Sequence, residues 1–136
     1  MQNLVLVDTS AWICFFARKG FPEIKEAISI LLDDNRVAIA GPILVELKQG
    51  AKADKERDSL NEVIRGLHWL TITDDHWHET ADLSFRLRRK GITASSIDSL
   101  ITAVALSYNC KILHKDRDFE LIAKHTPVKL YDLLRE

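Results

Sequence analysis

Four acidic side chains stand where carboxylates could act together. Asp8 directly follows the apolar segment LVLV, and Asp116 follows the segment KILH after a single lysine. Glu46 and Asp98 each lie near the start of a predicted helix, among apolar residues. In open α/β sheets, functional groups gather beyond the carboxyl ends of the strands. We therefore expect the four carboxylates to face one crevice.

Carboxylates that converge in this way repel one another, and burying them without partners is costly. Their pKa values rise unless a cation neutralises them. Oxygen ligands without a nearby set of His or Cys residues favour Mg²⁺ or Mn²⁺ over zinc. Such an ion lowers the pKa of a bound water and holds phosphate oxygens during an in-line displacement. The chemistry indicated is phosphodiester hydrolysis.

Each acid taken alone also has a purely structural interpretation. Asp98 suits the first turn of a helix, where the helix dipole favours a negative charge. Glu46 suits a solvated helix position, and Asp116 suits the cap of the helix that follows it. Asp8 is harder to explain in this way, because it ends a buried strand. The coincidence of four acids at one end of the sheet is what favours a functional site.

The elements that must position these acids follow from the hydrophobic pattern. Short apolar runs typical of buried parallel strands occur at 4–7, 37–40, 68–72 and 111–114, with a short fifth at 128–130. Helical spacing of apolar residues occurs at 24–32, 60–67, 77–90 and 97–105. This alternation predicts an α/β protein, a three-layer α/β/α sandwich around a mainly parallel sheet of four to five strands. No linker or repeat interrupts it, so we expect one domain over residues 1–136.

Cap signals delimit two of these helices. Thr73 or Asp74 suits the start of the helix that Gly91 ends. Ser95 or Ser96 suits the start of the helix that carries Asp98, and Asn109 suits its end.

Composition places further bounds on function. The chain has 136 residues, with 19 Lys and Arg against 20 Asp and Glu, and its formal net charge is −1. This balance argues against a strongly basic nucleic-acid coat or a polybasic membrane binder, but not against an enzyme that acts on nucleic acid. Cys14 and Cys110 lie in apolar segments and have no metal-site spacing, which favours buried free thiols. The N-terminal segment reads as a strand and no apolar run is long enough to cross a bilayer, so we expect a cytoplasmic protein without a membrane segment.

Four segments together resemble a known family. They are LVDTSAW, LVELKQG, SSIDSLITAVA and ILHKDRDFELIA, in this order along nearly the whole chain. They are similar to the four acidic motifs of PIN-domain ribonucleases, and within that group to the VapC toxins of toxin–antitoxin pairs. The resemblance implies an endoribonuclease dependent on Mg²⁺ or Mn²⁺. Its metal pocket, and thus its catalytic set, would be Asp8, Glu46, Asp98 and Asp116.

The resemblance also implies a mechanism and partners. A water activated by the metal would attack the RNA phosphodiester, leave a 5′-phosphate and need no 2′-hydroxyl as nucleophile. The toxin would form a homodimer. A VapB-like antitoxin would occupy the active-site groove with its C-terminal tail.

The match departs from the family pattern in one position and is ambiguous in another. His114 stands where the family often has Thr, two residues before the fourth acid, so a hydroxyl is missing there. Ser10 is a supporting residue that could supply one. Either Asp116 or Asp118 could be the fourth acid. We favour Asp116, because Asp118 resembles the part of the motif that anchors the next helix.

RNA binding requires phosphate contacts, which come mainly from Arg and Lys. Lys48, Lys115 and Arg117 are candidates because they neighbour the predicted catalytic acids in sequence. A denser basic run at 86–90 precedes Gly91, where cations also complement the end of a helix.

Other functions fit the sequence less well. An aspartyl-phosphate phosphotransferase of the haloacid-dehalogenase type needs a second acid two residues after the first, where this chain has Ser10. A receiver domain needs an Asp at the end of a later central strand, where this chain has Gly41 and Pro42. A nucleotide-binding Rossmann domain needs a Gly-rich turn after its first strand, and none is present. A non-catalytic RNA-binding or scaffold protein of the same fold is the alternative, and the presence of all four acids speaks against it.

Overall fold

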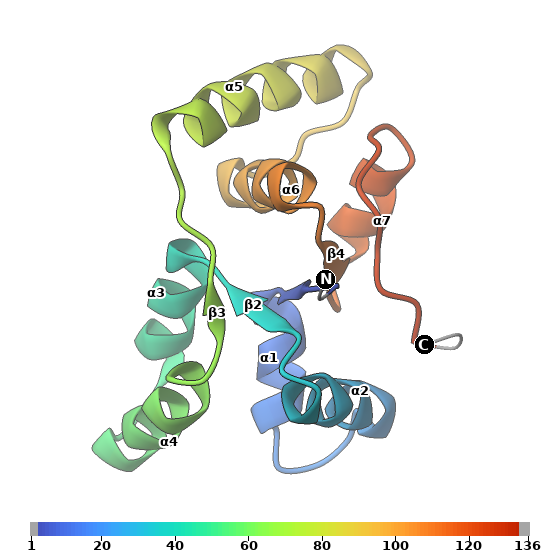
Figure 1. The fold of residues 1–136 in the computed structure, drawn as a ribbon. Helices are drawn as coiled ribbons and strands as arrows, with labels where there is room; N and C mark the ends of the chain where they lie inside the picture. The colour runs from blue at the N-terminus through green and yellow to red at the C-terminus, as the bar shows by residue number, and fades with distance from the viewer. Residues whose placement is uncertain (1–2, 134–136) are drawn as a thin grey trace.

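The computed structural model describes residues 3–133 and contains one parallel sheet (Figure 1). Its strands are β1 (Val5–Val7), β2 (Val37–Ile39), β3 (His68–Trp69) and β4 (Lys111–Leu113). They are arranged in the order β3-β2-β1-β4. The central strand β1 pairs with both β2 and β4, and Leu6 lies opposite Ala38 on one side and Ile112 on the other. All carboxyl ends of the strands therefore point to the same edge.

Helices connect the strands and cover both faces of the sheet. Within the described residues they are α1 (Thr9–Phe16), α2 (Pro22–Asp33), α3 (Gly41–Gly50), α4 (Asp54–Ile64), α5 (Asp74–Arg89), α6 (Ser96–Tyr108) and α7 (Arg117–Ala123). In Figure 1, α6 lies over one side of the sheet with α5 outside it, and α1 and α2 lie on the opposite side. The predicted three-layer α/β/α architecture is confirmed.

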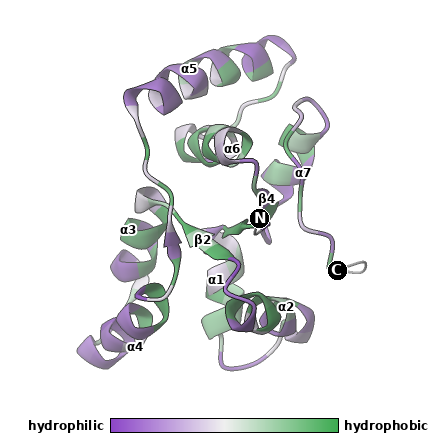
Figure 2. Ribbon diagram, viewed as in Figure 1, coloured by the Kyte–Doolittle hydropathy of each residue, from purple (hydrophilic) through white to green (hydrophobic). Residues whose placement is uncertain are grey.

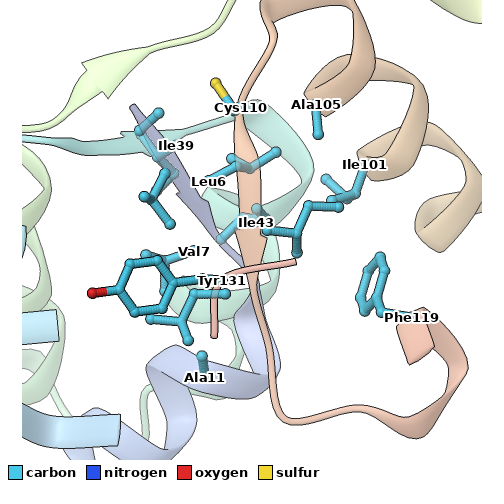
Figure 3. Close-up of a cluster of buried hydrophobic side chains, with 14 of the residues drawn as sticks. Leu6, Val7, Ala11, Ile39, Ile43, Ile101, Ala105, Cys110, Phe119 and Tyr131 are labelled. Atoms are coloured by element: carbon cyan, nitrogen blue, oxygen red, sulfur yellow. The ribbon is translucent and has the colours of Figure 1, made fainter. Parts of the chain in front are cut away.

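The core lies between the sheet and these helices. Figure 3 shows side chains from β1, β2, α6 and α7 meeting in one cluster, and Leu6, Ile101 and Phe119 in it are fully buried. In Figure 2, apolar residues concentrate in the strands and in α6, whereas α4 and α5 are mostly hydrophilic. The outer helices therefore present polar surfaces, and the inner elements supply most of the hydrophobic stabilisation.

A buried histidine ties the start of α5 to the end of α6. Its side chain, His76, is 5% exposed. The Nδ1 atom accepts a hydrogen bond from the Thr73 backbone N–H at 2.8 Å, and Nε2 lies 2.9 Å from Ser107 Oγ. The ring also stacks on Tyr108 at 5.6 Å between centroids. These contacts hold α6, and hence the acid at its other end, against α5.

The cap predictions hold, and two strand predictions need revision. Thr73 caps α5, Ser95 caps α6, and Gly91 and Asn109 adopt left-handed backbone φ angles of 81° and 56° after these two helices. The predicted strand at 68–72 shortens to two residues. The predicted fifth strand at 128–130 is a single parallel bridge, between Leu130 and β4.

Neither cysteine forms a disulfide: both Cys14 and Cys110 are buried free thiols, as predicted. Among the described residues, no helix is both long enough and apolar enough to span a membrane.

Truncation of the central strand tests this description of the core. Leu6 is 0% exposed, and its strand β1 pairs with a strand on each side, β2 and β4. We expect Leu6→Ala to lower the free energy of unfolding by about 2–5 kcal/mol, because it removes buried methyl groups and leaves a cavity. Urea denaturation measures the change. Ile13→Ala is the matched control, since Ile13 is 62% exposed on α1, and we expect a change within about 0.5 kcal/mol. Equal losses in the two variants would contradict the packing described.

Candidate active site

Asp8 is the most deeply buried of the predicted acids. It follows β1, caps the N-terminus of α1 and is 6% exposed. Its Oδ2 atom accepts hydrogen bonds from the Ser10 backbone N–H at 3.0 Å and from the Ser10 hydroxyl at 2.7 Å. These two donors fix the carboxylate and satisfy one of its oxygens, so a buried acid is tolerated at this strand end.

Ser10 also joins the ends of two strands. While its hydroxyl donates to Asp8, the same oxygen accepts the Lys115 backbone N–H at 2.9 Å. In addition, the Asp8 N–H donates to the Leu113 carbonyl at 2.9 Å. Ser10, predicted as a supporting residue that supplies a hydroxyl at the site, thus has a structural contact there. It holds the segment after β4 against the segment after β1.

Asp98 faces this edge from the first turn of α6. Its backbone N–H donates to the Ser95 hydroxyl at 3.0 Å, which caps the helix. The carboxylate is half-buried. The pKa of this carboxyl is raised from 3.8 to about 6: burial contributes most, the charges of Asp116, Asp8 and Asp118 follow in that order, and a hydrogen bond with Ser95 opposes the shift. Carboxylates that lie this close together disfavour one another's charged form, in the same direction as burial.

Asp116 and Asp118 complete the acidic group. Asp116 caps α7, and its Oδ1 atom accepts the Asp118 backbone N–H at 2.9 Å. Asp98, Asp116 and Asp118 can each offer one carboxylate oxygen, and these three oxygens lie within 4.8 Å of one another. Sequence reasoning treated Asp116 and Asp118 as alternatives, whereas the structure brings both to Asp98.

Glu46 lies apart from this group. Its side chain is exposed on α3, and its Oε1 atom accepts a hydrogen bond from the Thr9 hydroxyl at 2.7 Å. It does not belong to the group of three oxygens, and it is not among the charges that shift the pKa of Asp98. Thr9 adjoins Asp8 in sequence, so the bond still attaches Glu46 to the edge of the site. Sequence analysis did not identify Thr9, because a Thr in this position is not distinctive.

The predicted RNA-binding residues lie in two different parts of the structure. Lys115 and Arg117 flank Asp116, and both line an open groove of about 810 Å³ beside the acids. The residues of this groove are Lys115, Asp116, Arg117, Asp118, Glu120, Leu121 and Lys124. Lys48 lies in the last turn of α3, near Glu46 in sequence and outside this groove.

The acidic group fits a divalent cation. Its donors are carboxylate oxygens alone, and within the described part of the chain no His or Cys joins them. Such a donor set suits a hard cation, which would also offset the mutual repulsion recorded in the pKa of Asp98.

An α/β sandwich with carboxylates gathered beyond the ends of its parallel strands defines the class of this protein. The profile of the PIN domain matches residues 5–125. The chain therefore belongs to the PIN-domain family.

Its relatives include named ribonucleases. VapC ribonuclease Mb1587 of Mycobacterium bovis is 34% identical over 126 residues, which cover 90% of this chain and 94% of the relative. Ribonuclease VapC11 of Mycobacterium tuberculosis matches with the same identity and coverage.

Solved structures of low sequence identity share the fold. The DNA-bound VapBC from Salmonella typhimurium gives a TM-score of 0.79 at 22% identity and covers 98% of this chain and 99% of its own. FitAcB from Neisseria gonorrhoeae gives 0.75 at 15% identity, with coverage of 98% and 100%.

The raised pKa of Asp98 predicts how stability depends on pH without metal. Between pH 3.8 and about 6 the folded protein holds a proton that the unfolded chain has released. The folded state binds this proton more tightly than the unfolded chain does. The resulting contribution to the free energy of unfolding is fully present below pH 3.8 and is lost as the pH rises through about 6. We expect Asp98→Asn to remove this loss and to raise the free energy of unfolding at pH 7 in EDTA.

Urea denaturation at pH 4 to 7 measures the difference between wild type and variant. Asp82→Asn, at an exposed position on α5, is the control and should not change the pH dependence. An Asp98→Asn protein that is less stable than wild type at pH 7 in EDTA would contradict the described repulsion.

Proposed function

We propose that this chain is a metal-dependent endoribonuclease that acts as the toxin of a VapBC-type toxin–antitoxin pair. One observation carries the chemical part of this proposal: Asp98, Asp116 and Asp118 converge at the carboxyl edge of the sheet, with Asp8 close enough to act on Asp98. The relatives named VapC ribonuclease support the activity, and VapBC structures of the same fold are consistent with it.

Mg²⁺ or Mn²⁺ is the proposed cofactor. Asp98 and Asp116 would hold it together with Asp8, and Asp118 is placed to add a further oxygen. A bound divalent cation supplies Lewis acidity, lowers the pKa of water and neutralises charge on a phosphate. Glu46 remains in the proposed catalytic set, at the side of the site reached through Thr9.

The residues of the chain prepare the site before any ligand arrives. Ser10 orients the Asp8 carboxylate through two donors to Oδ2. Ser95 and the first turn of α6 direct Asp98 toward the same place, where the positive end of the helix dipole favours a negative group. An RNA phosphate placed among these groups would be hydrolysed by water, with a 5′-phosphate as product and no requirement for the 2′-hydroxyl.

RNA would approach through the groove beside Asp116. Lys115 and Arg117 remain the proposed phosphate contacts, and the groove adds Lys124 as a third cation. Lys48 would meet RNA only on the side of the site that carries Glu46.

The proposed partners follow from the relatives. A VapB-like antitoxin would bind this chain and silence it; structures of the same fold include DNA-bound VapBC of Salmonella typhimurium and VapBC2 of Rickettsia felis. We also propose a homodimer, a single PIN-like domain over residues 1–136, and action in the cytoplasm, where its RNA substrate is found.

Cleavage of RNA in defined metals tests the proposal. Purified protein is incubated with mixed RNA in Mg²⁺, in Mn²⁺ and in EDTA, and product ends are analysed. We expect cleavage with either metal, none in EDTA, and 5′-phosphate ends. Asp98→Asn should reduce the rate by about 10²–10³-fold, since it removes a charge from the proposed metal site.

Glu79→Gln provides the matched control, because Glu79 is an exposed acid on α5 away from the acidic group. Its rate should equal that of wild type. Cleavage that persists in EDTA, or that is unchanged in Asp98→Asn, would overturn the proposed mechanism.

Salt dependence of RNA binding tests the groove. In the Asp98→Asn background, in which cleavage is expected to be slow, Arg117→Gln combined with Lys124→Gln removes two proposed phosphate contacts. Because each contact releases counterions, the slope of log K against log salt should become shallower by about 1.4. Fluorescence anisotropy with single-stranded RNA measures it. Lys19→Gln with Lys55→Gln, both exposed and outside the groove, should leave the slope unchanged. Equal slopes in both double variants would place the RNA elsewhere.

A further inference from the structure

The side chain of His114 lies between β4 and the loop that carries the acids. It follows the last residue of β4, and only 9% of the side chain is exposed. The ring packs against Phe119, which is fully buried, with 5.4 Å between ring centroids and an angle of 49°. The ring is thus held in place by the core, and its two nitrogens face the acid-bearing segment.

One ring nitrogen holds the backbone of a proposed metal ligand. The Asp116 N–H donates to Nδ1 of His114 at 3.0 Å. Because an Nδ1 that accepts this N–H carries no proton, the contact uses the tautomer with its proton on Nε2. Nε2 in turn lies 3.3 Å from Oε1 of Glu120, an acceptor that favours a proton in this position. The surroundings therefore select the tautomer that can hold Asp116.

The hydrogen bond from the Asp116 N–H is part of a series in which side chains accept successive backbone N–H groups of this loop. Ser10 accepts the N–H of Lys115, His114 accepts that of Asp116, and the Asp116 carboxylate accepts that of Asp118. The hydrogen bond to His114 joins residues two apart. An Asn side chain makes the same kind of contact when its carbonyl oxygen accepts the backbone N–H two residues later in a turn. Without it the Asp116 N–H has no partner in this set, and the loop loses the contact that fixes its direction.

We propose that His114 is a positioning residue, whose Nδ1 holds the Asp116 N–H and so aims the Asp116 carboxylate toward Asp98 and sets the affinity of the site for a divalent cation. This inference rests on the proposed function, since it assumes that these acids bind the metal. His114 would act through Asp116 and touch neither metal nor RNA.

Packing against Phe119 is the competing role for the ring, and two substitutions separate the two roles. His114→Phe keeps an aromatic ring in the core but has no acceptor. His114→Asn loses the ring but keeps a carbonyl oxygen that can accept the N–H of the residue two positions later. If His114 positions Asp116, the Asn variant retains metal binding and the Phe variant loses it. A purely packing role predicts the opposite order.

The test measures Mn²⁺ binding to the full chain without RNA, by electron paramagnetic resonance of free Mn²⁺. We expect His114→Phe to weaken binding by about 10–100-fold, as is usual when a group that orients a metal ligand is lost. His114→Asn should stay within a few-fold of wild type even if its melting temperature falls. Wild-type affinity in His114→Phe, or equal weakening in both variants, would overturn the proposal.

Nitrogen-15 spectra of the metal-free wild type provide a readout that does not depend on metal. They should show His114 with a protonated Nε2 and an unprotonated Nδ1, and the reverse tautomer would also overturn the proposal.

Asp98→Asn distinguishes failure of the proposed metal site from failure of the role proposed for His114. If wild type and Asp98→Asn bind Mn²⁺ equally, the proposed metal site itself fails, and the role of His114 fails with it. If only Asp98→Asn lowers affinity, the site stands and the inference about His114 alone is wrong.

Discussion

Repulsion among carboxylates at one edge of the sheet is the constraint on which the rest of the structure depends. Burial, followed by the charges of three neighbouring acids, raises the pKa of Asp98 to about 6. A folded chain keeps such an arrangement only if other interactions offset its cost, and it gains from it only if a cation binds there. The buried core supplies the first condition, and the all-oxygen donor set suits the hard cation that we propose for the second.

The N-termini of helices, more than the strands themselves, position the acids. Asp8 and Asp116 cap the helices that follow β1 and β4, and Asp98 stands in the first turn of α6. Each position gives the carboxylate a backbone donor or the positive end of a helix dipole. The parallel topology then brings the three helix starts to one edge. Stability and function thus use the same residues, because one oxygen of each capping carboxylate accepts a backbone N–H of its helix while the carboxylate stays at the edge where the acids gather.

Much of this arrangement could be predicted from sequence. Apolar runs predicted the strands, and the position of an acid after a run predicted the convergence of Asp8 and Asp116. Local signals, such as Thr73 before a helix and Gly91 after it, were also sufficient. Helix α1 was not predicted, because its sequence is apolar on nearly all sides and shows no amphipathic spacing.

Contacts that depend on the direction of individual side chains could not be predicted. Three features depend on side-chain directions that only packing fixes. They are the inclusion of Asp118 in the acidic group, the hydrogen bond between Thr9 and Glu46, and the hydrogen bond from the Asp116 N–H to His114. The shortness of the fifth strand has the same origin, since pairing at a sheet edge is decided by the neighbouring chain and not by local propensity.

Anomalous diffraction from crystals soaked in Mn²⁺ tests the central claim most directly, because it locates the cation without reference to activity. The account predicts an anomalous peak at coordination distance from carboxylate oxygens of both Asp98 and Asp116, and its loss in Asp98→Asn. A peak elsewhere on the chain, or no peak at this edge at Mn²⁺ concentrations that support RNA cleavage, would contradict it.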